Sequence, residues 1–446
     1  MNQPISRRQF VASSITAGAA IALMPRTSLR AAESASNKVV LAIAGAHNRG
    51  KDLIQKFGSL PGVELKYIVD VDSRYLPAAV AIAEKKQGHA PNTENDFRRV
   101  LEDKDVDALI IATPDHWHAP MAILGAKAGK HVYVEKPCSH NPHEGELLVE
   151  VASKYKRLVQ MGSQRRSIGN VQQLVQEIHD GIIGRVFLAQ CFYARRRPPI
   201  GFGKAVPPPK ELDWDLWQGP APRTAYRDNV APYNWHWFWR WGTGEALNNG
   251  THYLDVARWA LDVTYPIKAS SFGGRWHDVG LDDWEAPDTQ EIQLEFPGGR
   301  GISWFGRSCS TYGAPGYKAN GNIFYGNQGT IDYDGGGAYT VYDLDNKPLK
   351  TVGEDPAKKT NLTNSTDPGL DDHHAQNFIE SIRGNTKLNA PILEGFRSTL
   401  LGQLGNIAQR TGHTLQIDPT NGHILGDRKA AKLWTREYEP GWKPTI

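Results

Sequence analysis

Residues 39–50 read VVLAIAGAHNRG, an apolar run that ends in a turn with glycine at Gly45 and Gly50. A strand that enters such a turn and continues as a helix is where α/β proteins hold the pyrophosphate of a dinucleotide. The first glycine makes the turn, the second lets the pyrophosphate approach, and the third packs helix on strand. His47 stands where the second glycine belongs, so this stretch predicts a dinucleotide site only together with its surroundings.

After this stretch, strand-like apolar runs alternate with segments of helical pattern. Further apolar runs occupy residues 64–69, 108–112, 131–134 and 158–161. Short, nearly continuous apolar strands between amphipathic helices require a parallel sheet that is covered on both faces. Residues 37–163 are therefore predicted to form a doubly wound, Rossmann-type domain.

An acidic residue closes the second of these strands. Asp70 has the spacing from the glycine turn that is expected of a carboxylate binding the ribose hydroxyls, with a turn or helix cap as the alternative. Asp70 and Asp72 would repel a 2′-phosphate, which favours NAD over NADP. Arg74, close by, keeps NADP possible.

Two more segments follow predicted strands at the same edge, 113–118 (TPDHWH) and 135–137 (EKP). Open α/β sheets bind ligands at the carboxyl ends of their strands. Lys136, followed by proline, sits on a stiff backbone, and a cis bond there is one way to aim it. His116 and His118 lack a third ligand nearby, so packing is favoured and no metal site is predicted.

The composition is that of a soluble, two-domain protein. A chain of 446 residues exceeds what one hydrophobic core usually supports. A hydrophobic fraction of 40%, a charged fraction of 22% and a net charge of +3 make nucleic acid an unexpected partner. The three cysteines are too few for a disulfide scaffold. Among 13 tryptophans, six fall within 214–241, which fits either a carbohydrate pocket or loop packing.

The N-terminus reads as an export signal. Arg7 and Arg8 precede a weakly apolar run at 11–23, and small residues follow at 31–35. The run is too short for a stable membrane anchor. Residues 1–36 are therefore predicted to be a twin-arginine signal peptide, with a periplasmic or extracellular mature protein. Because such a compartment offers no nicotinamide pool, we expect the cofactor to be held tightly.

Taken together, the turn at 45–50, Thr113-Pro114 with His118, and Glu135-Lys136-Pro137 resemble the glucose-fructose oxidoreductase, inositol dehydrogenase and rhizopine catabolism (Gfo/Idh/MocA) family. The resemblance continues through 212–220, 244–255 and 325–330, His374 with Asn377-Phe378, and 433–442, which is essentially the whole mature chain. The predicted cofactor-binding residues are Gly45, His47, Asn48, Arg49, Gly50, Asp70, Thr113, Pro114, His118, Glu135 and Lys136.

The resemblance implies that residues 164–446 form an α+β domain for substrate binding and oligomerisation, with an open, mostly antiparallel sheet. Local patterns agree. Strands are expected at 186–193, 267–272, 290–296, 301–306 and 330–333, and helices at 170–179, 251–261, 372–383 and 393–410. Since such a sheet leaves one face exposed, and family members commonly pair through it, a homodimer or homotetramer is expected.

The resemblance also implies the catalytic residues. In family members the lysine of Glu-Lys-Pro and a histidine on the active-site helix touch the reacting hydroxyl, which points here to His252 as base and Lys136 as electrostatic helper. Asn248 replaces an aspartate of many dehydrogenases and can position a hydroxyl but accept no proton. Asp255 is expected either to orient this helix or the imidazole or to serve structure alone.

Substrate residues are placed around the mouth of the site. Tyr233, His236 and Arg240 are expected there with Trp235 or Trp237 as a stacking floor, although this aromatic stretch equally fits a packed loop. Arg165, Arg166 and 195–197 offer positive charge for an acidic sugar or phosphate, with solvation at the surface as the commoner alternative for such arginines. The acidic and histidine run at 371–374 is better explained by a helix start than by a metal.

Three functions fit the sequence. The first is an NAD(P)-dependent oxidoreductase acting on a secondary hydroxyl of a sugar, glycoside or polyol. The second is a redox-neutral, NAD-dependent glycosidase that oxidises, eliminates, hydrates and reduces; the segment 250–252 does not resemble the corresponding stretch of that family. The third, a non-catalytic dinucleotide-binding protein, is disfavoured by the presence of Lys136 and His252.

Overall fold

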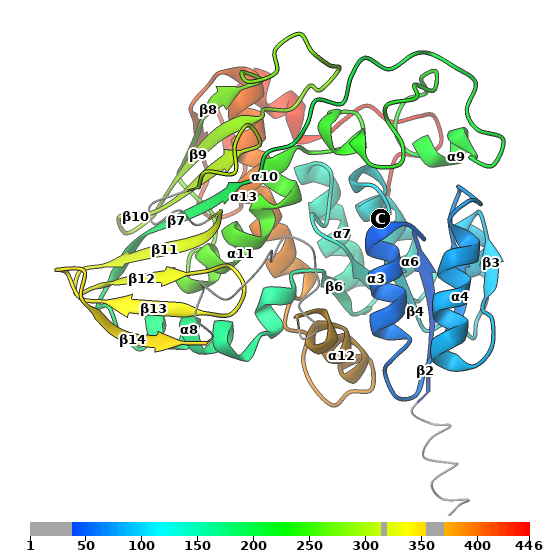
Figure 1. The fold of residues 1–446 in the computed structure, drawn as a ribbon, viewed down its shortest axis with the longest axis horizontal. Coiled ribbons are helices and arrows are strands. Elements are labelled where there is room, and N and C mark those ends of the chain that lie inside the picture. The colour runs from blue at the N-terminus through cyan, green and yellow to red at the C-terminus, as the bar shows by residue number, and fades with distance from the viewer. Residues whose placement is uncertain (1–37, 314–318, 354–369) are drawn as a thin grey trace, which may run out of the picture.

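The computed structural model describes residues 38–313, 319–353 and 370–446, so the predicted signal peptide lies outside the described residues. The first domain is built on a six-stranded parallel sheet with the order β3-β2-β1-β4-β5-β6 (Figure 1). Its strands are β1 (Val39–Ala44), β2 (Val63–Val69), β3 (Asn92–Glu94), β4 (Ala108–Ile111), β5 (His131–Val134) and β6 (Val159–Met161). Its helices are α3 (Asn48–Phe57), α4 (Leu76–Gln87), α5 (Phe97–Leu101), α6 (Asp115–Lys127) and α7 (Pro142–Lys154).

The predicted Rossmann-type domain is thereby confirmed. β4 is buried along its whole length, as a central strand covered on both faces must be. Only β3 was not foreseen, because it is three polar or acidic residues long and pairs at the edge of the sheet.

The second domain carries a ten-stranded sheet with the order β14-β13-β12-β11-β7-β10-β9-β8-β15-β16. All neighbours pair antiparallel except β7 with β10, which confirms the predicted α+β class. Its strands are β7 (Val186–Ala194), β8 (Lys268–Gly274), β9 (Thr289–Phe296), β10 (Arg300–Arg307), β11 (Asn320–Gly326), β12 (Thr330–Tyr333), β13 (Tyr339–Tyr342), β14 (Pro348–Val352), β15 (Leu415–Ile417) and β16 (Ile424–Leu425).

The helices of the second part of the chain pack on this sheet and on the first domain. They are α8 (Gly169–His179), α9 (Trp214–Gln218), α10 (Glu245–Asn248), α11 (Gly250–Ala260), α12 (Leu370–Ile382), α13 (Ile392–Thr411) and α14 (Arg428–Ala431), with short 3₁₀ turns at Gln164–Ser167, Asn234–Trp237 and Lys432–Trp434. None of the helices in the described residues combines the length and apolar character needed to cross a bilayer.

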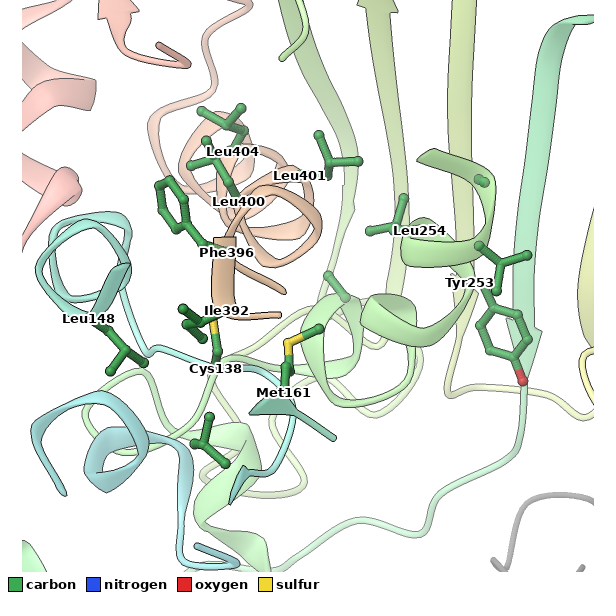
Figure 2. Packing of buried hydrophobic residues seen from close by; sticks show 14 of the residues in the cluster. Cys138, Leu148, Met161, Tyr253, Leu254, Ile392, Phe396, Leu400, Leu401 and Leu404 are labelled. Atoms are coloured by element: carbon green, nitrogen blue, oxygen red, sulfur yellow. The ribbon is translucent and has the colours of Figure 1, made fainter. Parts of the chain in front are cut away.

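Two late helices join the domains. α12 places Phe378 and Ile379 in the hydrophobic core formed by β1 and α3. α13 packs against α7, β8 and α11, and Figure 2 shows its Phe396 and Leu400 in the same buried cluster as Leu148 of α7. Residues 164–446 thus do not form a separate body, since α12 completes the core of the first domain. An amphipathic pattern predicts a helix but carries no information on which sheet the helix will cover.

Candidate functional site

A cavity of about 810 Å³ opens where the carboxyl ends of β1, β2, β4 and β5 meet α11 and the loops of the second domain. Most predicted site residues line it, which places residues far apart in sequence around one space. They are Gly45, His47, Asn48, Arg49, Asp70, Thr113, Pro114, His118, Glu135, Lys136, Arg165, Tyr233, His236, Trp237, Asn248 and His252. Gly50, Arg240 and Asp255 do not line it.

The glycine turn is shaped by two close approaches. Gly45 has φ of 98°, and a Cβ there would lie 2.4 Å from the carbonyl oxygen of Ala112. A Cβ on Gly50 would lie 1.9 Å from the Gly45 carbonyl oxygen. Only glycine fits at either position, and Gly50 acts by packing α3 onto the turn.

The N-terminus of α3 faces the cavity. His47, the residue before the helix, makes no side-chain cap, and the first N–H groups of a helix have no partner within it. Such a terminus binds a phosphate through N–H groups and the helix dipole. The His47 ring packs on Tyr75 with ring centroids 4.3 Å apart, so a side chain at the second glycine position is accommodated to one side.

Asp70 lies at the end of β2 beside this turn. Its carboxylate accepts hydrogen bonds from the backbone N–H of Ala46 (2.6 Å) and of Asp72 (2.9 Å). Burial raises the pKa of Asp70 to about 6. Arg74, which kept NADP possible, donates to the carboxylate of Asp72 instead, at 2.8 Å through Nε. The acidic end of β2 therefore suits ribose hydroxyls and opposes a 2′-phosphate.

Arg49 connects three elements at the floor of the cavity. Its Nε donates to Glu135 at 2.7 Å, and its two terminal nitrogens donate to Asp371 of α12 at 2.7 and 2.8 Å. Glu135 also accepts from the backbone N–H of Lys136 at 3.2 Å. Glu135 and Arg49 thus hold the backbone on either side of the site, and Asp371 anchors α12 to both.

Lys136 lies at the centre of the cavity, before a cis peptide bond to Pro137. Its Nζ donates to the backbone carbonyl oxygen of Asn248 at 2.8 Å, so Asn248 contributes through its main chain as well as its amide. Burial lowers the pKa of Lys136, an effect that the carboxylates of Glu135 and Asp115 oppose. Among the described residues, no carboxylate lies within ion-pair distance of this ammonium, which is held by the Asn248 carbonyl.

His252 stands on the first turn of α11. Its Nδ1 is buried and has no hydrogen-bond partner among the described residues. Burial, followed by the charges of Arg165 and Lys136, lowers the pKa of His252 well below 6.5. A neutral imidazole beside a lysine ammonium can accept a proton from a hydroxyl that the ammonium polarises.

Aromatic side chains form the opposite wall. His236 stacks on Trp235 with ring centroids 3.6 Å apart, and its Nδ1 lies 2.6 Å from the Tyr233 carbonyl oxygen. Burial lowers the pKa of His236 to about 3. Trp237 stacks on Trp284, with centroids 3.9 Å apart. These rings pack on each other, as a packed loop requires, and they also line the cavity. Their stacking on a sugar stays a prediction.

Two predicted site residues lie elsewhere. Arg240 is exposed and donates to the Pro222 carbonyl oxygen at 3.1 Å, outside the cavity wall. Asp255 is fully buried, and its carboxylate accepts from Arg166 at 2.8 to 3.0 Å and from Ser398 at 2.6 Å. Asp255 does not line the cavity, and its buried contacts favour the structural alternative over a role beside His252.

Several site residues were not predicted. Glu245 is buried next to the cavity, where it accepts from the lining residues Arg197, at 2.7 Å, and Asn249. Trp284 and Asp115 line the cavity themselves, and Asp115 accepts from Thr243 at 2.5 Å. Glu245 lies in the segment 244–255, which carries part of the family resemblance, so it could have been predicted as a site residue. Trp284 could not, because no pattern in its own part of the sequence indicates that it stacks on Trp237.

The residues that line the cavity offer a partner for each part of a nicotinamide dinucleotide. The uncapped start of α3 suits the pyrophosphate, Asp70 suits the ribose, and the nicotinamide end would reach Lys136 and His252. No group of three His, Cys, Asp or Glu side chains among the described residues is placed to hold a metal. The fold and the cavity together define a dinucleotide-binding, two-domain enzyme.

Comparison with known families agrees. Residues 39–163 match the model of the Gfo/Idh/MocA oxidoreductase family, NAD-binding Rossmann fold, and residues 171–332 match the model of its C-terminal domain. Between them the two models match more than half of the chain. The chain belongs to the Gfo/Idh/MocA family, and its cofactor is NAD.

Curated relatives include a glycosyl hydrolase family 109 protein from Saccharopolyspora erythraea, 30% identical over 225 residues, 46% of this chain and 49% of the relative. An alpha-N-acetylgalactosaminidase from Shewanella oneidensis is 31% identical over 211 residues, 42% of this chain and 46% of the relative. The chain spans about half the length of the curated relatives it matches.

Among solved structures, a levoglucosan dehydrogenase in complex with NADH and levoglucosan is similar with a TM-score of 0.64 and 19% identity, over 85% of this chain and 99% of that one. The WlbA dehydrogenase from Bordetella pertussis, in complex with NADH and UDP-GlcNAcA, has a TM-score of 0.62 and 20% identity, over 85% and 99%. These likenesses show the fold.

Proposed function

We propose that the protein oxidises a secondary hydroxyl of a sugar, glycoside or polyol while keeping its NAD bound. The observation that carries this proposal is the pairing of Lys136, held at 2.8 Å by the Asn248 carbonyl, with the unpartnered Nδ1 of His252 in the NAD cavity. Bound NAD supplies the hydride acceptor. Lys136 stabilises the developing alkoxide, and His252 accepts the hydroxyl proton.

Retention of the cofactor is supported by a segment of the second domain, residues 205–241, here named the cover. It reaches the first domain (green, with α9, in Figure 1). Its Leu212 forms a bridge with Asp72, and its Asp213 N–H donates to the Val71 carbonyl at 2.9 Å. The cover thus lies over the end of β2, where the adenosine ribose would bind. This arrangement fits the proposed twin-arginine export of an already loaded enzyme to the periplasm or beyond.

A redox-neutral NAD-dependent glycosidase is the second candidate. It is favoured by the glycosidase names of the curated relatives and by His236, a second imidazole that lines the same cavity as Lys136 and could take the carbon-bound proton. In this chemistry a hydroxyl is first oxidised to a ketone. Loss of the neighbouring carbon-bound proton and of the glycosidic alcohol follows, then addition of water and return of the hydride. Simple dehydrogenation needs only one base, so His236 would be surplus to it.

The test begins with mass analysis of the acid-quenched mature protein for co-purified NAD. The reduced-nicotinamide absorbance is then followed while sugars and glycosides are added, with Lys136→Ala and His252→Ala as comparison variants. Bound NAD and a sugar-dependent band that both variants lose would support the oxidoreductase. Cleavage of a glycoside without net change in the band would support the glycosidase. Absence of bound NAD and of any response would overturn both.

A further inference from the structure

Two of the cations that line the cavity, Arg49 and Arg197, are matched by carboxylates. Arg49 pairs with Glu135 and Asp371, each at 2.7 Å. Arg197, at the end of β7, pairs with Glu245 at 2.7 Å. Matched pairs of this kind leave the local charge near zero, so these side chains organise the wall and offer no charge to a ligand.

Three arginines on the substrate side are not matched. Arg165, Arg195 and Arg196 line the cavity, yet none has a carboxylate within ion-pair distance among the described residues. The hydrogen bonds of Arg165 go to neutral groups: its Nε donates to the Gly335 carbonyl at 2.8 Å, and its Nη2 to the Tyr253 hydroxyl at 3.3 Å. Against the effect of burial, Tyr253, Tyr333 and the nearby Asp334 carboxylate raise the pKa of Arg165.

The unmatched arginines lie on the substrate side of the site. After burial, Arg165 is the largest cause of the lowered pKa of His252, which places its charge beside the reacting centre. Arg195 and Arg196 leave the end of β7, where the Arg195 N–H donates to the Arg307 carbonyl at 2.9 Å. The pyrophosphate, by contrast, is served by the N-terminus of α3. The negative charge of the cofactor's pyrophosphate is therefore not the partner of these three arginines.

Together with the Lys136 ammonium, the three guanidinium groups bring four cations to this half of the cavity, and the buried Asp115 carboxylate offsets part of their charge. Arg165 and Arg195 are half-buried, and Arg196 is exposed at the rim. Guanidinium groups in a sheltered cleft bind carboxylates, sulfates and phosphates through paired, charge-assisted hydrogen bonds. We infer that the substrate is a sugar carrying an anionic substituent, a carboxylate or a sulfate or phosphate ester, recognised by Arg165, Arg195 and Arg196. This inference rests on the proposed function and specifies its substrate class.

Calorimetric titration of the NAD-loaded protein tests it with matched probes. The probes are D-glucuronate against D-glucose, D-galacturonate against D-galactose, and glucose 6-sulfate and glucose 6-phosphate against glucose. We expect at least one anionic probe to bind about tenfold or more tightly than its neutral parent, and the preference to weaken in high salt. Comparing the uronates with the esters shows which anion the arginines select.

Variants locate the effect. Arg195→Gln with Arg196→Gln should reduce the preference about tenfold or more, since each lost charge-assisted bond removes a comparable factor. Arg240→Gln is the matched control, because Arg240 has the same charge and a carbonyl contact but lies outside the cavity. Equal binding of anionic and neutral probes, binding of no anionic probe, or an equal effect of Arg240→Gln would overturn the inference.

Binding and turnover separate this inference from the proposed function. Tight, arginine-dependent binding of an anionic sugar without any change in nicotinamide absorbance and without glycoside cleavage would overturn the proposed chemistry and leave the recognition intact. Turnover of neutral sugars with no preference for anionic ones would do the reverse.

Discussion

Lys136 and His252 are shifted in the same direction by the same cause. Burial penalises the charged form of each, which lowers the pKa of the lysine from 10.5 and that of the histidine well below 6.5. The proposed reaction requires opposite protonation states of the two groups, because Lys136 acts as a charged ammonium and His252 as a neutral imidazole. The window in which both conditions hold is therefore moved toward acid relative to unperturbed groups.

This shift predicts the pH profile of kcat/KM. As pH falls, His252 stays neutral until its lowered pKa is reached, so the acid limb should lie well below pH 6.5. As pH rises, Lys136 loses its charge at a lowered pKa, so the alkaline limb should begin below pH 10.5. In His252→Asn the acid limb should disappear and the rate fall by about 10²- to 10⁴-fold. An acid limb at or above pH 6.5 would contradict the assignment of His252 as base.

Asp255 gives a test of structure against chemistry. Its carboxylate is buried with Arg166 and Ser398, so Asp255→Asn leaves a guanidinium partly unpaired and should lower the free energy of unfolding by about 3–5 kcal/mol. Denaturant unfolding measures this loss. Turnover per bound NAD at a temperature where the variant is folded should stay within about twofold of the parent. If Asp255→Asn lost turnover while its free energy of unfolding stayed unchanged, Asp255 would have a role in catalysis.

The sequence located correctly those cavity-lining residues that directly follow a strand of the parallel sheet. Lys136 and Asp70 could be located because a parallel sheet brings the carboxyl ends of its strands to one edge. Arg240 could not, because the aromatic stretch folds as turns in which neighbouring residues point in different directions. Asp255 failed for a related reason: a spacing of three fixes a helix face only roughly, and the buried Arg166 comes from elsewhere.

Among the elements, α12 is held on the first domain by the buried ion pair of Asp371 with Arg49 as well as by the packing of Phe378 and Ile379. Asp371→Asn removes the bidentate partner of Arg49 and should lower the free energy of unfolding by about 1–3 kcal/mol. Asp372→Asn is the matched control, since its pair with Lys56 is more exposed and should contribute about 1 kcal/mol or less. Thermal unfolding of the two variants side by side measures the difference. Equal losses would show that Arg49 does not anchor α12.

Element existence was easier to predict than element placement. The strands at 39–44 and 131–134 and the helix at 393–410 match β1, β5 and α13 closely, because long periodic patterns persist whatever the tertiary context. β11 at Asn320–Gly326 was missed, since asparagine and glycine flank its apolar centre and resemble a turn. Its place beside β7 is set by cross-strand pairing, which no local pattern records.

At the scale of the whole molecule, we expect the cover to control how tightly the proposed enzyme retains NAD. The cover contacts the first domain at the end of β2 and at the start of α6, where the Ser73 N–H donates to the Glu211 carbonyl at 3.0 Å and the His116 N–H to the Trp241 carbonyl at 3.1 Å. The Trp217 carbonyl lies 2.9 Å from the His116 Nε2 and accepts from Trp117 at 3.0 Å, and Leu212 bridges Asp72. Release of the cofactor should therefore be limited by opening of the cover rather than by the pyrophosphate turn.

The cap of α9 offers a way to loosen the cover without touching the cavity. The Asp213 carboxylate caps this helix by accepting from the Leu216 N–H at 2.9 Å, and loss of an N-cap costs about 1 kcal/mol. Asp213→Ala should thus speed NAD release about fivefold, as measured by trapping released NAD with a coupled dehydrogenase. Asp215→Ala, on an exposed position of the same helix, should leave the release rate unchanged. Equal rates in parent and Asp213→Ala would mean that the cover does not control release, and that retention depends on the contacts of Asp70 and α3 alone.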